Sequence, residues 1–166
     1  MSVFHQFVVH GLLQDEEYAR AMLAGVLRGD ELDKAVALRM KRQAILRRDN
    51  PPWLEVLMTE SALRDVVGSP EIMRSQLARI LEDMDRLYGT VQIIPDGAVY
   101  LNPFSILTFG HGPDLVYAEV AVSPGQFYND KRRVQAFKVR YSRIRSLALP
   151  VGASATLVRE IMEQMS

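Results

Sequence analysis

The chain has 166 residues, with 20 Lys and Arg, 20 Asp and Glu, and no cysteine. This length is typical of one domain with its own core, so residues 1–166 are predicted to form a single domain. A net charge of zero argues against a protein that coats nucleic acid, because phosphate binding requires an excess of basic residues. Without cysteine, disulfides and thiolate metal sites are excluded, and the composition fits a cytoplasmic protein. No window reaches the roughly 18 apolar residues of a membrane span, so no membrane contact is expected.

Two helices are predicted near the N-terminus. The first follows the turn HGLLQ at 10–14, with Asp15 as a suitable N-cap and acidic residues in its first turn. The second helix is predicted over 30–48 and ends before Pro51. The short Gly-Asp turn between them predicts a helical hairpin.

A strand–helix–strand unit is predicted next. The segment LEVLM at 54–58 has the composition of a strand, and TVQIIP at 90–95 is rich in β-branched residues. Between them, Ser69 begins a helix whose apolar residues recur every 3.6 positions over 70–88. Such a unit usually gives two parallel strands joined by a crossover helix.

The remaining strands are predicted to form a meander. It comprises a short strand at 98–101, a strand at 103–109 and a strand at 115–122. The loop 110–113 joins the last two as a hairpin, and the Pro-Gly pair at 124–125 is predicted to end the sheet.

Two C-terminal helices complete the predicted architecture. A basic helix is expected over 130–148, and another follows Pro150. Both are expected to close the other side of the sheet. The predicted fold is therefore α+β (or α/β), with an N-terminal helical hairpin and a four- or five-stranded mixed sheet.

Several phrases occur together in the order of one known family. They are GLLQDEEYARAML, RQAILRRDNPPWLEVLMTESALR, VGSPEIMRSQLARILE, TVQIIP, VYAEV and RYSRIRSLALP. From about residue 8 onward the chain resembles the C-terminal domain of actinobacterial antitoxin-like transcriptional regulators, a domain of otherwise unknown function that follows an XRE-type helix-turn-helix. His10 and Asp15 stand where that family typically has Pro and Thr.

The resemblance implies a regulatory module rather than an enzyme. Such a module would sense a small-molecule effector, or bind a small toxin-like partner protein, and pass that state to DNA binding. DNA would be contacted only through a separate helix-turn-helix domain, which is expected to lie outside this chain.

Motifs that would predict an enzyme or a cofactor are absent from the sequence. His5, His10 and His111 are far apart and have no helical metal-site spacing, so no metal is predicted. His111, between two glycines, is expected to be a solvated turn residue. No Gly-x-Ser-x-Gly, P-loop or dinucleotide pattern occurs. Neither a cofactor nor a catalytic residue is therefore predicted.

Carboxylates near the strands suggest a binding site. Along the strand 115–122, Tyr117 and Glu119 point to one face, and Val116 and Ala118 point to the other, which should pack on a helix. Tyr117 and Glu119 then face water or a polar cavity. The residues predicted to line a ligand pocket are Trp53, Glu60, Arg64, Tyr100, Phe104, Tyr117 and Glu119. A small hydrolase that uses Glu60 and Glu119 is a third, less favoured reading.

Two segments, 34–48 and 131–145, are basic and contain no acid. Ordinary solvated helix faces explain them most simply. The alternative is a protein–protein module whose basic helices bind an acidic small protein or steady DNA phosphates. The residues predicted for that partner surface are Arg39, Arg42, Arg132, Arg133, Lys138 and Arg140. The sequence is also compatible with a homodimer.

Overall fold

The computed structural model describes residues 1–86, 88–97, 101–120 and 123–165. The strands are β1 Ser2–His5, β2 Leu54–Thr59, β3 Gly89–Ile94, β4 Phe104–Leu107, β5 Leu115–Val120 and β6 Ser123–Tyr128. The helices are α1 Glu16–Leu23, α2 Gly29–Gln43, α3 Ser61–Arg64, α4 Pro70–Arg86, α5 Lys131–Arg145 and α6 Val151–Gln164. A 3-10 turn at Ala44–Arg47 follows α2.

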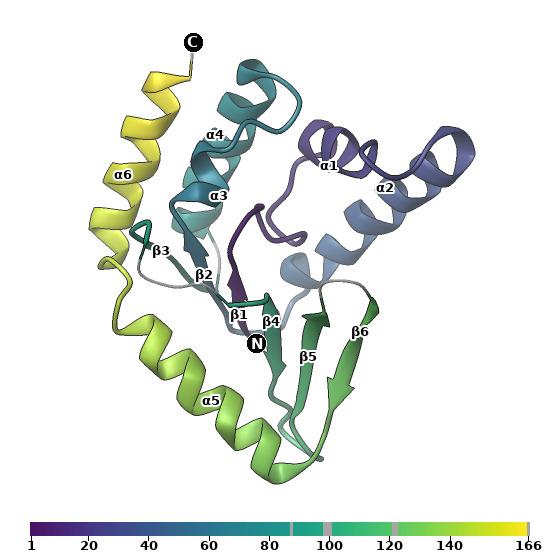
Figure 1. Ribbon diagram of the computed structural model, residues 1–166, viewed down its shortest axis with the longest axis vertical. Coiled ribbons are helices and arrows are strands. Elements are labelled where there is room, and N and C mark those ends of the chain that lie inside the picture. The colour runs from purple at the N-terminus through teal and green to yellow at the C-terminus, as the bar shows by residue number, and fades with distance from the viewer. Residues whose placement is uncertain (87, 98–100, 121–122, 166) are drawn as a thin grey trace.

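The described strands form one mixed sheet in the order β3–β2–β1–β4–β5–β6 (Figure 1). β1, β2 and β3 are parallel, and α4 is the crossover between β2 and β3, as the sequence predicts. β4, β5 and β6 are antiparallel neighbours, and β1 joins the two halves by pairing with both β2 and β4. The predicted mixed α+β fold and the N-terminal pair of helices are confirmed.

The two faces of the sheet have separate cores. On the first face, Val56 and Val91 of the parallel half pack against Leu77 of α4 and Ile161 of α6. On the second face, Phe104 and other apolar residues lie beneath α5. Apolar residues on both faces explain why the parallel strands have nearly continuous apolar sequences rather than alternating ones.

Two short strands were not predicted, so the described sheet has six strands instead of four or five. β1 has only four residues, and Val3 and Phe4 are both fully buried because the strand is interior and each residue faces a different core. The prediction that 124–125 ends the sheet is wrong, since β6 spans those residues. β6 is at the edge of the sheet, where a proline need not donate a ladder hydrogen bond.

The C-terminal helices cover opposite faces, which corrects the expectation that both close one side. After α5, the chain returns across the free edge of β3. There the Leu149 N–H donates to the Ile93 carbonyl at 2.8 Å, and the Ser154 hydroxyl accepts from the Ile93 N–H at 2.9 Å. These bonds satisfy backbone groups at an otherwise open edge. The predicted strand at 98–101 falls largely on residues 98–100, outside the described residues.

Candidate functional site

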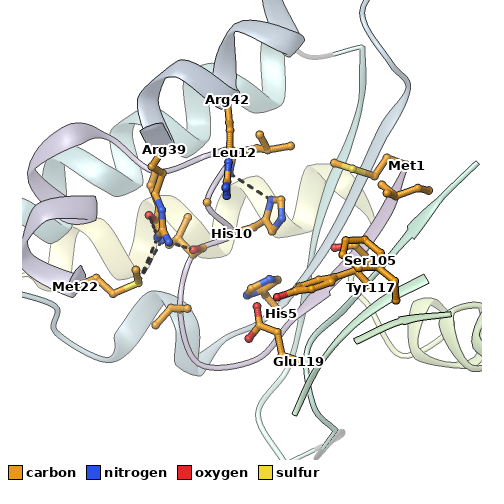
Figure 2. A pocket seen from close by; sticks show the side chains of 16 residues that line it. Met1, His5, His10, Leu12, Met22, Arg39, Arg42, Ser105, Tyr117 and Glu119 are labelled. Carbon is orange, nitrogen blue, oxygen red and sulfur yellow. Dashed lines mark hydrogen bonds between the residues drawn. The ribbon is translucent and has the colours of Figure 1, made fainter. Parts of the chain in front are cut away.

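A cavity of about 800 Å³ lies on the first face of the sheet, over its antiparallel half (Figure 2). The sheet provides its floor, the segment 8–12 and His5 form its wall, and Arg39 and Arg42 of α2 form its roof. Its volume is in the upper part of the range typical of small-molecule sites.

The floor of the cavity is made by alternate residues of β4 and β5. Ser105 pairs with Tyr117 in the register of these strands, and both line the cavity together with Glu119. Val116 and Ala118, on the other face, are buried beneath α5. This confirms the predicted orientation of the strand.

Gly125 of β6 leaves space for the Tyr117 ring in the floor of the cavity. A Cβ added at Gly125 would lie 2.2 Å from the ring carbon Cζ of Tyr117, so only glycine leaves the ring in its present place. The Tyr117 ring lies 5.0 Å from that of Phe127, which also lines the cavity. The floor therefore offers an aromatic surface next to a carboxylate.

Buried amide side chains hold the segment 8–15, which contains most of the wall and has neither helix nor strand. Gln14 Nε2 donates to the Val9 carbonyl at 2.7 Å. Gln43 Nε2 of α2 donates to the Gln14 carbonyl at 2.6 Å. Gln76 of α4 donates to the Leu13 carbonyl at 2.8 Å, and its Oε1 accepts from the backbone N–H of residue 15 at 2.8 Å. These glutamines satisfy backbone groups that would otherwise be buried without partners.

Two histidines face the cavity from the wall. The rings of His5 and His10 are 4.8 Å apart, edge to face. Burial, together with the charge of Arg39, lowers the pKa of His5 to about 4. Burial, His5 and Arg39 lower the pKa of His10 to about 3. Both imidazoles are therefore neutral at neutral pH, and Nδ1 of His10 accepts from the Leu12 N–H at 3.4 Å.

Two arginines form the roof. Arg39 and Arg42 are three residues apart on α2, so they share one side of the helix. Arg39 Nη1 donates to Gln14 Oε1 at 2.7 Å. Neither guanidinium forms a salt bridge with a described residue. Burial and the neighbouring Arg42 lower the pKa of Arg39, while burial raises the pKa of Glu119 against the opposing effect of Arg39.

Of the residues predicted to line a pocket, Tyr117 and Glu119 do so. Phe104 does not, because it pairs with Ala118 and so points to the second face. There its ring packs 5.8 Å from Phe4 and 5.1 Å from Phe137.

Trp53, Glu60 and Arg64 do not line the cavity. Trp53 precedes β2 and packs edge-on against Tyr88 at 5.0 Å. Glu60 pairs with Arg64 at 2.6 Å, and Arg64 also donates to Gln164 of α6 at 3.0 Å. Tyr100 lies outside the described residues.

The predicted partner surface is divided between the two faces of the sheet (Figure 1). Arg39 and Arg42 line the cavity, whereas the other four residues are on α5. These are Arg132, Arg133, Lys138 and Arg140. Lys138 pairs with Asp114, which belongs to the β4–β5 loop. The two basic helices therefore do not form one surface.

The charged and titratable cavity residues that the sequence did not indicate as pocket residues are His5, His10, Arg39 and Arg42. They come from β1, the segment 8–12 and α2, which only the fold brings together. Spacing along the chain carries no signal for such a group.

The described residues contain no group of three or more His, Cys, Asp or Glu that could hold a metal ion. Among them, too, no helix is long and apolar enough to cross a membrane. His111 is exposed in the β4–β5 hairpin, as expected.

Comparison with known proteins gives one match. The model of a family described as a domain of unknown function, DUF5753, matches residues 1–160. No curated protein and no solved structure matches the chain. Since the match covers almost the whole sequence, the chain belongs to the DUF5753 family.

Proposed function

We propose that the chain is the effector-sensing domain of a cytoplasmic helix-turn-helix transcription regulator, and that it binds a small molecule without covalent chemistry. The observation that supports this is the cavity between α2 and the antiparallel half of the sheet. Its floor is aromatic and acidic and its roof is basic, so a ligand would contact both layers at once. DNA would be contacted by a separate domain.

The mechanism depends on how loosely α2 is attached. Of its 15 residues, Val36 and Gln43 are buried. Its polar contacts to other segments include the exposed Arg20–Asp33 ion pair at 2.6 Å, the Arg39–Gln14 hydrogen bond at 2.7 Å and the hydrogen bonds of Gln43. An element with so little buried apolar surface belongs to the less stable part of a fold. A ligand that bridges roof and floor would favour one position of α2 over others.

A hydrolase is less well supported by the geometry. Glu119 lines the cavity, but Glu60 does not, and its carboxylate is held by Arg64. The paired carboxylates that glycoside hydrolysis requires are therefore not found together.

The proposal is tested by screening a library of small metabolites for stabilisation of the purified chain. A ligand present at 100 times its Kd stabilises the folded state by about 2.7 kcal/mol. For a chain of this size that corresponds to a rise in Tm on the order of 5–10 °C. Ser105→Phe places a ring on the cavity floor and is expected to abolish the rise for the same compounds.

Ser142→Phe is the matched control, because Ser142 is exposed on α5, on the opposite face of the sheet. Its response to ligands should equal that of the wild type. Compounds that stabilise the wild type and Ser105→Phe equally would bind elsewhere, and the proposal would then be rejected.

The surface of α5 supports a second candidate function, the binding of an acidic partner protein. Arg132, Arg133 and Arg140 are exposed there, and none forms a salt bridge with a described residue. Exposed cations of one sign can steer an acidic surface into place. A partner bound there would protect α5 from hydrogen exchange, whereas a cavity ligand would protect α2.

A further inference from the structure

We propose that the ligand of this cavity is an organic anion, a carboxylate or a phosphate monoester, whose charged end is held by Arg39 and Arg42. The inference rests on the proposed sensing function and specifies its ligand. It also requires that the rest of the ligand be largely apolar. Three features of the cavity support it: the charge balance of the lining, the free donors of the roof and the aromatic floor.

The charged groups of the lining do not balance. Arg39 and Arg42 bring two positive charges, and Glu119 is the single carboxylate among the described lining residues. The two histidines add no charge near neutral pH, because burial and Arg39 keep them neutral. The cavity is therefore net positive whether or not Glu119 is ionised, and a negative charge from a ligand would restore the balance.

The roof has unused donors. Arg39 uses Nη1 for Gln14 and for the sulfur of Met22, at 3.8 Å, which fixes the direction of its guanidinium. The remaining N–H groups of Arg39, and those of Arg42, have no carboxylate partner among the described residues. Other arginines without a salt bridge to a described residue, such as Arg132 and Arg140, lie on the surface of α5, whereas Arg39 and Arg42 line the cavity. Two guanidinium groups with free donors on one side of a helix suit a carboxylate or phosphate.

The floor fits the other end of such a ligand. The rings of Tyr117 and Phe127, tilted by 49° to each other, give an aromatic surface, and Leu107 lines the same cavity. Glu119 beside them would accept a hydrogen bond from a donor on the ligand (Figure 2). A ligand with a negative end and an aromatic body would thus contact roof and floor together, which is the contact that sensing through α2 requires.

The experiment is a titration of the ¹⁵N-labelled chain by nuclear magnetic resonance, with observation of the arginine Nε–H signals. The probes are benzoate, phenyl phosphate and inorganic phosphate as anions, benzamide as the neutral analogue and benzylamine as the cationic one. Benzoate or phenyl phosphate is expected to shift the Arg42 signal saturably, with a Kd in the millimolar range usual for so small a ligand. Which of the two binds more tightly distinguishes a carboxylate from a phosphate ligand.

Benzamide is expected to bind at least about tenfold more weakly than benzoate, because it has the same ring without the charge. Arg42→Gln should weaken benzoate about tenfold while the spectrum remains that of a folded chain. Arg143→Gln, which removes an exposed charge on α5, should leave the Kd unchanged. Higher salt should weaken the anions and not benzamide.

The inference is overturned if benzamide or benzylamine binds as tightly as benzoate, or if no anion shifts the Arg42 signal. It is also overturned if Arg42→Gln and Arg143→Gln behave alike. None of these results decides the sensing function, which depends on whether the metabolite screen finds compounds blocked by Ser105→Phe. If Ser105→Phe abolished the binding of a neutral compound, the sensing function would be supported and the anionic nature of the ligand would be contradicted.

Discussion

For His10, the sequence and the structure indicate different roles. In the sequence it belongs to a turn before an acid-capped helix, and its nearest histidine gives no metal-site spacing. In the structure it forms the cavity wall, with its ring beside His5 and beneath the basic roof. The N-cap predicted at Asp15 is confirmed, because its carboxylate accepts from the Tyr18 N–H at 2.8 Å. The place of His10 in the cavity wall was not predictable, because it depends on Arg39, which comes from another element.

The neutral His10 predicts a pH-dependent stability. Its pKa is about 3 in the folded chain and about 6.5 when unfolded, so between these values only the unfolded state binds the proton. The free energy of unfolding therefore falls as the pH is lowered from about 6.5. Where the unfolded state alone is protonated, one histidine contributes a slope of about 1.4 kcal/mol per pH unit.

Urea unfolding of His10→Asn at several pH values between 7 and 4 measures this contribution. Asn keeps an acceptor for the Leu12 N–H and does not titrate, so the slope should be shallower than in the wild type. His111→Asn, in the exposed hairpin, should keep the wild-type slope. Equal slopes for His10→Asn and the wild type would show that His10 is not held neutral.

The buried glutamines mark the limit of sequence reasoning at this scale. Gln14 is 1% exposed and Gln76 is fully buried, although glutamine is mostly a surface residue. Their side chains hydrogen-bond the backbone of a non-helical segment. Nothing in their local sequence indicates this, because the partner of Gln76 lies about sixty positions away.

At the scale of elements, long segments with a clear period were predicted well. The helix expected over 70–88 is α4, and the strands expected at 54–58 and 90–95 are β2 and β3. β1 and β6 were missed because a strand of four residues and a strand containing Pro-Gly give no reliable period. Gly89 is the first residue of β3.

Gly89 gives a prediction about the pairing of β2 and β3. It pairs with Leu54, and a Cβ at Gly89 would lie 1.7 Å from the Leu54 carbonyl oxygen. Backbone atoms of an interior strand cannot move away easily, so Gly89→Ala should cost about 3 kcal/mol or more. Thermal unfolding should show a fall in Tm on the order of 6–12 °C.

Gly110→Ala provides the matched control, because an added Cβ there meets no atom within 4 Å. Its free energy of unfolding should stay within about 0.5 kcal/mol of the wild type. If Gly89→Ala were as stable as Gly110→Ala, the close approach of β3 to Leu54 would be contradicted.

For the whole molecule, the central feature is the uneven covering of the sheet. α4 and α6 cover the parallel half of the first face, and α5 covers the second face (Figure 1). The antiparallel half of the first face carries the cavity, with α2 above it. The sequence predicted the face of Tyr117 and Glu119. It could not predict what lies opposite them, since that depends on how α2 crosses the sheet.

The most direct measurement is a map of backbone amide shifts for the metabolite that stabilises the wild-type chain most. The shifts are expected to cluster at 8–12, at 39–43 and on the floor strands β4 and β5, with α5 unchanged. Shifts concentrated on α5, or spread without relation to the cavity, would contradict it.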